Sequence, residues 1–448
     1  EIQMSEQKVV KSKWLLDMVS DKPIEDGAVI FQDGKIKLSG HYEKIKGKIH
    51  PDAKVYDYKD KIIIPGMVDC HTHHNGFGDG RSGDDVGLIP DDVLTIQSAR
   101  NAKTSLYSGV TTIRENGPKN MTMMRLRDAV NSGLAIAPRM VLCGRPIAII
   151  GGHMGYFGGE VTGEDESLAL ARQLIKEGVD YFKITATGGS TATSFPLRPS
   201  FSKSELFAVT NEAKNYDMLT ATHCLSTEGT DYSLDAGVDM IIHCNFDQAN
   251  GESIFDPKLA DKIIEKGAYV NPTIHVGRAR LWSLMEGNDP SLGGFENKRM
   301  GSVSINKDRK NILDARLDMA KLGLETKLDH CRKMIDMGVK VITGSDSSWG
   351  DYPLGNTVHE TELLVEAGYS NLEGLKSVTI NAAKALGLDD EVGSLESGKS
   401  ADIAILDKNP LDDIKNLNSV SEVFFMGNCI NRGSEESNNS YIQKSPKV

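Results

Sequence analysis

Two histidines separated by one residue follow directly after an apolar run near residue 70. The run Ile62–Val68 has the pattern of a strand, and it leads into the segment Asp69–His73. Alternate residues of an extended strand point to the same face, so the side chains of His71 and His73 are expected to lie side by side. Two imidazoles on one face can bind one divalent metal ion such as zinc. Taken alone, the pair is weak evidence for a metal site, because two solvated histidines at a strand edge explain it more simply.

Four more residues that can take part in metal binding stand at the ends of short apolar runs farther along the chain. They are Lys183, His223, His243 and Asp346. In a barrel of parallel strands the carboxyl ends of all strands surround one axis, so such residues become neighbours. Each one alone has a plain structural alternative: a hydrogen-bonded core histidine, a solvated lysine, or a helix cap for Asp346. Their joint placement favours a single site.

The elements that must position these residues follow an alternating pattern. From Pro65 to about Leu388, short apolar runs alternate with longer amphipathic stretches, which indicates repeated β-α units and a parallel sheet. Eight runs can be counted: Ile62–Val68, Val110–Ile113, Arg139–Cys143, Tyr181–Thr185, Leu219–Thr222, Asp239–Ile242, Ala268–Asn271 and Val339–Thr343. The pattern predicts an α/β fold, a (β/α)₈ barrel of the TIM type with its chemistry at the carboxyl ends of the strands. Residues 273–310 show no clear period, and we expect either a helical insertion or a cover over the site there.

Both ends of the chain have the pattern of β structure outside that barrel. Residues 1–64 contain short β segments with Asp-Gly turns, and residues 389–431 contain two more β-like runs. We therefore predict a small β-sandwich domain formed by residues 1–64 and 389–431, beside a barrel of residues 65–388. Residues 432–448 are polar and rich in serine and asparagine, and we expect a flexible tail.

Composition limits the class of protein. Of the 448 residues, 39% are hydrophobic and 25% charged, which is typical of a globular enzyme. The net charge of −12 and the lack of a basic patch argue against nucleic acid or an anionic membrane as a partner. No apolar run approaches the roughly 20 residues of a membrane-spanning helix. The six cysteines are few and unclustered, so we expect no disulfide framework and a cytoplasmic protein. A removed targeting segment is left open because the chain begins at Glu1.

Together these motifs resemble the metal-dependent amidohydrolase superfamily, in its imidazolonepropionase-like and Xaa-Pro dipeptidase-like branch. The resemblance runs from about Gly27 to Ile430. Its motifs are the segment Pro65–His73, Gly151-Gly152-His153, Lys183 with Thr187–Gly189, His223, His243 and Gly344–Asp346. The segment Gly393–Asp402 is similar to the superfamily's return from barrel to β-sandwich.

The resemblance implies two divalent metal ions, with zinc expected. Five residues would be direct ligands: His71, His73 and Asp346 to one ion, and His223 and His243 to the other. Lys183 would be carboxylated by CO₂ and bridge both ions. A charge count favours this, because two ions, an ammonium and one aspartate sum to +4, whereas a carbamate and a bridging hydroxide lower the sum to +1. The alternative is an ordinary strand lysine with its amine in water.

The chemistry implied is hydrolysis of a carbon–nitrogen acyl bond. Two metals lower the pKa of a bound water towards about 7, so a bridging hydroxide is available as the nucleophile at neutral pH. Asp346 would take its proton and pass it to the leaving nitrogen, and His153 would face the substrate. Substrates of this kind are small amides, such as Xaa-Pro dipeptides or N-acyl amino acids. Arg198 could bind a substrate carboxylate, with a solvated loop arginine as its alternative. Tyr156, His275 and Trp349 are further candidates for substrate contact, and each has a structural or solvent-exposed position as its alternative.

Two alternatives stay open. Mononuclear deaminases and cyclic-amide hydrolases of the imidazolonepropionase type carry a glutamate three residues after the histidine of the fifth strand. That position is Ser226 here, and the first acid, Glu228, is out of register, so the binuclear amide hydrolase is favoured. The second alternative is a non-catalytic assembly protein on the same barrel, against which the complete ligand set argues. We expect a small-molecule substrate and a homo-oligomer.

Overall fold

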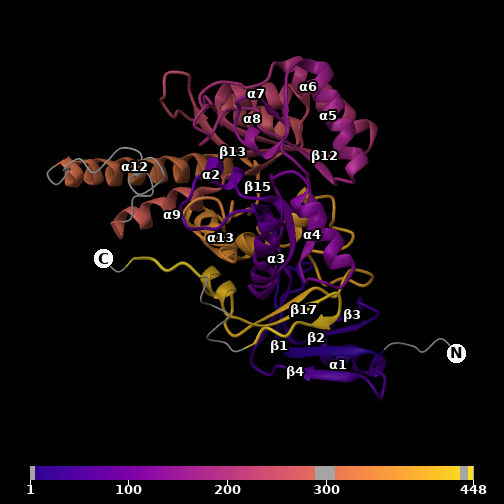
Figure 1. Cartoon of the computed structure of the whole chain (residues 1–448). Coiled ribbons are helices and arrows are strands. Elements are labelled where there is room, and N and C mark those ends of the chain that lie inside the picture. The colour runs from indigo at the N-terminus through magenta and orange to yellow at the C-terminus, as the bar shows by residue number, and fades with distance from the viewer. Residues whose placement is uncertain (1–5, 288–307, 434–441, 447–448) are drawn as a thin grey trace.

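Strands from both ends of the chain join in one mixed sheet, in the lower part of Figure 1. The computed structural model describes residues 6–287, 308–433 and 442–446. The N-terminal strands of this sheet are β1 (Lys8–Leu15), β2 (Ile24–Gln32), β3 (Lys35–His41), β4 (Lys54–Asp57) and β5 (Ile62–Pro65). The C-terminal strands are β16 (Ile403–Leu406), β17 (Val420–Phe425) and β18 (Asn428–Cys429). The two groups meet where β5 pairs antiparallel with β16.

Both faces of this sheet carry apolar side chains, because alternate residues of its strands point to opposite sides. On one face, Val10, Val29 and Phe31 are buried in a cluster with Phe424, whose ring lies edge-on to Phe31 at 5.8 Å. On the other face, a smaller cluster that includes Ile30 packs against helix α1 (Tyr42–Ile45). The 3₁₀ helices η1 (Lys46–Lys48) and η3 (Ile414–Asn418) complete these two chain ends.

Among the described residues between the two chain ends, eight parallel strands form two sheets, apart from the short parallel pair of residues 148–149 and 160–161. The first sheet holds β6 (Met67–Thr72), β7 (Val110–Glu115) and β8 (Arg139–Leu142). The second holds β11 (Tyr181–Ile184), β12 (Leu219–Ser226), β13 (Met240–Asp247), β14 (Tyr269–Asn271) and β15 (Lys340–Val341). Single parallel bridges connect the two sheets, one between Ile147 and Ile184 and one between Thr72 and Ser347. The fold is therefore mixed α/β, with sequential strands side by side.

Helices follow the strands. They are α2 (Gly83–Gly87), α3 (Asp91–Tyr107), α4 (Thr122–Asn131), α5 (Gly163–Glu177), α6 (Lys203–Asn215), α7 (Thr227–Ala236), α8 (Pro257–Lys266), α9 (Ile274–Met285), α12 (Asp308–Met337), α13 (Thr357–Glu366), α14 (Asn371–Ser377) and α15 (Ile380–Ala385). Between β8 and α5, the short strands β9 (Ala148–Ile149) and β10 (Glu160–Val161) flank the 3₁₀ helix η2 (Gly155–Phe157). Some helices begin at residues that satisfy the free N–H groups of the first turn. Asp256 caps α8, with Pro257 at its first position, and Ser202 caps α6 in a capping box.

One predicted strand is in fact two strands. The run Ile62–Val68 divides at Gly66, so that β5 belongs to the mixed sheet and β6 begins the parallel strands. A Cβ at Gly66 would lie 2.1 Å from the hydroxyl oxygen of Thr111, so only glycine lets the chain pass there. The pattern of apolar residues could not predict this division, because the residues of both strands are buried. The other seven predicted runs each overlap a strand.

Two expectations fall partly outside the described residues. Of residues 273–310, the structure describes α9 and the start of α12, which projects from the body of the fold in Figure 1. Residues 288–307, to which the expected cover extends, lie outside the description. Within the expected tail, the backbone of Gln443 forms hydrogen bonds with the side chains of Asn356 and His359. In the described part of the chain, no helix is both long and apolar enough to cross a membrane.

Candidate metal centre

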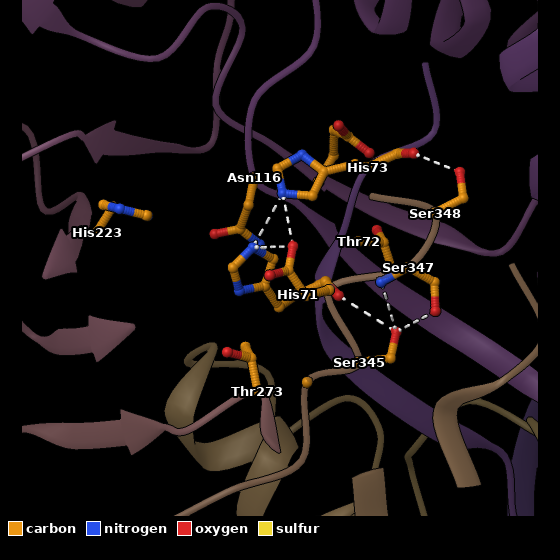
Figure 2. A network of polar contacts seen from close by, with 12 residues as sticks. His71, Thr72, His73, Asn116, His223, Thr273, Ser345, Ser347 and Ser348 are labelled. Atoms are coloured by element: carbon orange, nitrogen blue, oxygen red, sulfur yellow. Dashed lines mark hydrogen bonds and ion pairs between the residues drawn. The ribbon is translucent and has the colours of Figure 1, made fainter. Parts of the chain in front are cut away.

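The six residues predicted to hold metal lie at the carboxyl ends of the parallel strands. His71 lies at the end of β6, His73 directly follows that strand, and Asp346 stands in the turn after β15. The other three are Lys183 in β11, His223 in β12 and His243 in β13. All are buried except His243, which is half-buried. Strand topology thus places chain segments distant in sequence around one point (Figure 2).

His71, His73 and Asp346 form a compact group. The Nε2 atoms of His71 and His73 are 3.0 Å apart, and they lie 3.2 and 3.0 Å from Oδ1 of Asp346 (Figure 2). The backbone of Asp346 is left-handed, with φ of +59°, a conformation that non-glycine residues adopt mainly where surrounding structure enforces it.

Asn271 decides which ring nitrogen of His71 carries the proton. Its amide nitrogen donates to the carbonyl oxygen of Gly344 at 3.0 Å, which turns its oxygen towards Nδ1 of His71 at 2.9 Å. Nδ1 must therefore carry the hydrogen, and Nε2 presents a lone pair to the carboxylate of Asp346. Two electron-rich atoms at 3.2 Å repel each other unless a cation lies between them. This donor set fits a metal ion.

His223 and His243 are arranged in the same way. Nε2 of His223 donates to the carbonyl oxygen of Gly188 at 3.0 Å. Nδ1 of His243 donates to the hydroxyl of Thr273 at 2.5 Å, since that hydroxyl gives its own hydrogen to the carbonyl of Pro272. The remaining nitrogens, Nδ1 of His223 and Nε2 of His243, face each other at 2.9 Å with no proton assigned to either. The pair is thus prepared for a shared cation.

The charge states of these rings agree with a ligand role. Burial lowers the pKa of His71 to about 4 and holds the pKa values of His223 and His243 well below the ordinary range. The rings are therefore neutral at pH 7, which is the form that binds metal. The two histidine pairs adjoin, because the rings of His71 and His243 are 5.8 Å apart.

Lys183 is buried next to both pairs without a counter-ion. Its amine donates to the carbonyl oxygen of Asn116 at 3.3 Å, and it forms no ion pair with any residue that the structure describes. Its strand neighbours Phe182 and Ile184 are fully buried. Burial lowers the pKa of Lys183 to about 8, against the attraction of Asp346. A lysine in this state is partly neutral near physiological pH and can act as a nucleophile.

The predicted substrate contacts divide into two groups. The ring of His153 lies 4.3 Å from that of His223, and the ring of Trp349 lies 5.1 Å from that of His73, so both adjoin the ligand set. Tyr156 packs against Phe157 in the apolar cluster that also holds Trp349.

The two remaining candidates lie in different surroundings. Arg198 is exposed on the loop between β11 and α6. His275 is fully buried in α9, where Nδ1 accepts a hydrogen bond from Arg278 and the ring packs 4.6 Å from that of Tyr352.

Sequence reasoning missed the residues that hold the ligands in place. The carboxylate of Asp69 accepts hydrogen bonds from the backbone N–H groups of His71 and Ser345, both at 3.0 Å. It also accepts from the hydroxyls of Ser345 and Thr357, both at 2.6 Å. Asp69 therefore ties β6 to the turn that carries Asp346. Its place two residues before His71, on the same face of the strand, was an available signal.

Comparison with known proteins places this arrangement in a family. The sequence pattern of the Amidohydrolase family matches residues 62–430. Ochratoxinase of Aspergillus niger is 24% identical over 423 residues, which cover 88% of this chain and 80% of the relative. Imidazolonepropionase of Fusobacterium nucleatum is 22% identical over 411 residues, which cover 85% of each chain.

Solved structures agree with the sequence relatives. A Xaa-Pro dipeptidase with methionine bound in its active site superposes with a TM-score of 0.78 at 28% identity, covering 95% of this chain and all of the other. A putative prolidase from Bifidobacterium longum superposes with a TM-score of 0.74 at 27% identity, covering 98% of both chains. With the predicted ligands gathered at the strand ends and the family pattern running through most of the sequence, this chain belongs to the amidohydrolase family and is a hydrolase acting on carbon–nitrogen bonds.

Proposed function

We propose that the chain is a binuclear metal-dependent amidohydrolase that cleaves the amide bond of an Xaa-Pro dipeptide or an N-acyl amino acid. One observation carries the proposal. Within each of two adjacent sets of ligand atoms, two histidine nitrogens converge on one point, and Lys183 is buried beside both sets. One set has three ligands and the other has two. A second cation next to the His71 group explains why the His223 and His243 lone pairs converge.

The proposed ligand assignment follows these sets. His71, His73 and Asp346 hold one ion, and His223 and His243 hold the other. When bound, two divalent ions, zinc in our proposal, polarise a carbonyl and lower the pKa of a water towards about 7.

Lys183 completes this centre in carboxylated form. Its neutral amine attacks the carbon of CO₂ and loses a proton, which gives a carbamate anion able to bridge two cations. The buried site contains one carboxylate among the predicted ligands, so this second anion offsets charge that would otherwise stay uncompensated.

Other side chains handle the proton and the substrate. Asp346 accepts the proton released by the attacking water and delivers it to the leaving nitrogen, since its carboxylate faces the centre. His153 and Trp349 adjoin opposite ligand sets and are positioned to contact the acyl part of the substrate. Arg198, Tyr156 and His275 are retained as further proposals for substrate contact.

The architecture and setting around the site are part of the same proposal. The two parallel sheets, joined by bridges at Ile147 and Thr72, form one (β/α)₈ barrel spanning residues 65–388. Residues 1–64 and 389–431 form the accompanying β-sandwich domain. Five of the six cysteines are buried as free thiols, which supports a reducing, cytoplasmic location. We propose a homo-oligomer as well.

A mononuclear deaminase or cyclic-amide hydrolase is the second candidate, because imidazolonepropionases are among the relatives. In those enzymes an acid stands three residues after the histidine of the fifth strand. Here Ser226 occupies that position and uses its hydroxyl to accept from the N–H of Gly229 at the start of α7. Glu228 is exposed and accepts a hydrogen bond from Tyr232. Neither residue can shuttle a proton at the site, which favours the first candidate.

A hydrolysis screen tests the proposal. Zinc-loaded enzyme and a metal-stripped control are incubated with dipeptides, N-acyl amino acids, cyclic amides and aromatic amines, and products are identified by mass spectrometry. We expect metal-dependent cleavage of linear amides that carry an amino-acid carboxylate. If the enzyme instead hydrolysed only cyclic amides or removed only exocyclic amines, the mononuclear deaminase or cyclic-amide hydrolase would be favoured.

A further inference from the structure

Helix α12 packs across the carboxyl end of β13, the strand that carries His243. The ring of His330 on α12 lies 5.4 Å from that of Phe246, and its Nδ1 forms a hydrogen bond with the carbonyl oxygen of Asn245 at 3.2 Å. Cys331, the next residue, is fully buried. Lys327 lies three residues before His330 and four before Cys331, so it shares their side of the helix. This side of α12 faces the end of the fold that holds the predicted ligands.

Lys327 directs a positive charge to that region. Its charge lowers the pKa of His243, and the carboxylates of Asp247, Glu360 and Asp346 attract it. These groups come from β13, α13 and the turn after β15, three elements at the end of the fold that holds the predicted ligands. Burial lowers the pKa of Lys327 itself, as it does for an amine removed from water.

The ammonium of Lys327 has no bonded partner among the described residues. It is half-buried, yet it makes no hydrogen bond and no ion pair there. The carboxylate of Glu360 is engaged with the N–H groups of Ile274 and His275, at 2.9 and 2.7 Å, and that of Asp346 faces the histidines. By contrast, Lys333 on the same helix forms an ion pair with Asp329 at 2.6 Å. A half-buried ammonium without a bonded partner is suited to bind an anion that arrives with the substrate.

We propose that Lys327 binds the substrate carboxylate, so that the preferred substrate has a free carboxylate on the amino acid released by hydrolysis. This inference rests on the proposed function and deepens it, because it names the residue that binds the carboxylate shared by Xaa-Pro dipeptides and N-acyl amino acids. In such a substrate the carboxylate stands one carbon away from the scissile nitrogen. Because α12 packs on the carboxyl end of β13, a cation on that side of the helix stands at the same end of the fold as the ligand atoms, where the scissile carbonyl would lie. Lys327 takes the role that the sequence suggested for Arg198, which is exposed on another loop.

Steady-state kinetics on a matched pair of substrates tests the inference. The pair is the best dipeptide or N-acyl amino acid from the hydrolysis screen and the same compound as its terminal carboxamide. Lys327→Met keeps the length of the side chain and removes the charge. We expect it to raise KM for the free acid by about 10- to 100-fold, the range for a charge-assisted hydrogen bond, with a much smaller change for the carboxamide. Lys327→Arg should keep the preference for the acid.

Controls separate this inference from the proposed function. Lys333→Met removes a cation from the same helix and should behave like the wild type, while Arg198→Met tests the alternative carboxylate partner. A Lys327→Met enzyme that keeps the full preference for the acid overturns the inference, as does loss of the preference in Arg198→Met alone. Should Lys327→Met not fold, a wild-type enzyme that cleaves acid and carboxamide equally well overturns it too. A wild type that cleaves no linear amide overturns the proposed function itself.

Discussion

At the metal centre, neighbouring side chains and carbonyls decide which nitrogen of His71, His223 and His243 is free to bind metal. Asn271 fixes His71, and Thr273 fixes His243. The ligands themselves could be predicted, because they stand at the ends of apolar runs whose order implies a common edge. Their partners could not, since contact between Asn271 and His71 arises only when strands 200 residues apart are packed together. Mutation of such a partner commonly lowers metal affinity about 10- to 100-fold.

Thr273→Val tests this role of the partners. Valine keeps the shape of threonine but cannot accept the hydrogen bond from Nδ1 of His243, so the ring is no longer held in the tautomer that exposes Nε2. We expect metal affinity to fall about 10- to 100-fold, measured by competition with a chelator. Thr104→Val, in α3 and away from the site, is the matched control. Equal affinity in both variants would show that Thr273 does not orient His243.

Helices α9 and α13 meet through one buried carboxylate. Glu360 of α13 accepts hydrogen bonds from the backbone N–H groups of Ile274 and His275 in the first turn of α9. Burial raises the pKa of Glu360 to about 7, although those N–H groups, Lys327 and Arg278 favour its charged form. Sequence patterning does not set the bounds of either helix, since residues 273–310, which contain α9, show no clear period and α13 falls within the general β-α alternation. It does not reveal this connection, because a glutamate in a helix is ordinarily solvent-exposed.

Glu360 should make stability depend on pH with a definite sign. Its pKa in the folded state, about 7, lies above the ordinary 4.5, so the folded state binds the proton more tightly. The unfolding free energy therefore falls as pH rises from about 4.5 to about 7, by about 3 kcal/mol in total from this group. We expect Glu360→Gln to lose that part of the decline when urea unfolding is compared at pH 5 and pH 8. An identical decline in wild type and variant would assign the pH dependence to other groups.

Across the whole molecule, Asp402 joins the parallel strands to the mixed sheet. Its carboxylate lies 2.6 Å from Nη1 of Arg139 in β8 and accepts the N–H of Met426 at 2.8 Å. Its own carbonyl accepts the N–H of Gly66, where the chain passes from β5 to β6. The β character of both chain ends was predictable from their turns and short runs. Their register was not, since β5 and β16 are far apart in sequence and pair only in the folded chain.

Asp402→Ala is expected to lower the unfolding free energy by about 2 to 3 kcal/mol, because it removes the buried carboxylate that accepts from Arg139 and from the N–H of Met426, while Arg139 keeps its contact with Glu391. Asp407→Ala is the matched control: its ion pair with Lys61 is at the surface, so its loss should cost at most about 1 kcal/mol. Urea unfolding of both variants measures the difference. Similar losses would mean that the contact between Arg139 and Asp402 does not hold the two parts together.

The central claim is that two metal ions share the site with Lys183 between them, and the metal content of the purified enzyme tests it most directly. Elemental analysis by inductively coupled plasma mass spectrometry gives the number of ions per chain in the wild type and in Lys183→Ala. We predict about two ions in the wild type and a clear loss in the variant, with partial recovery of activity on addition of short carboxylic acids. One ion per chain in both proteins, with activity unchanged by the substitution, would contradict the binuclear account.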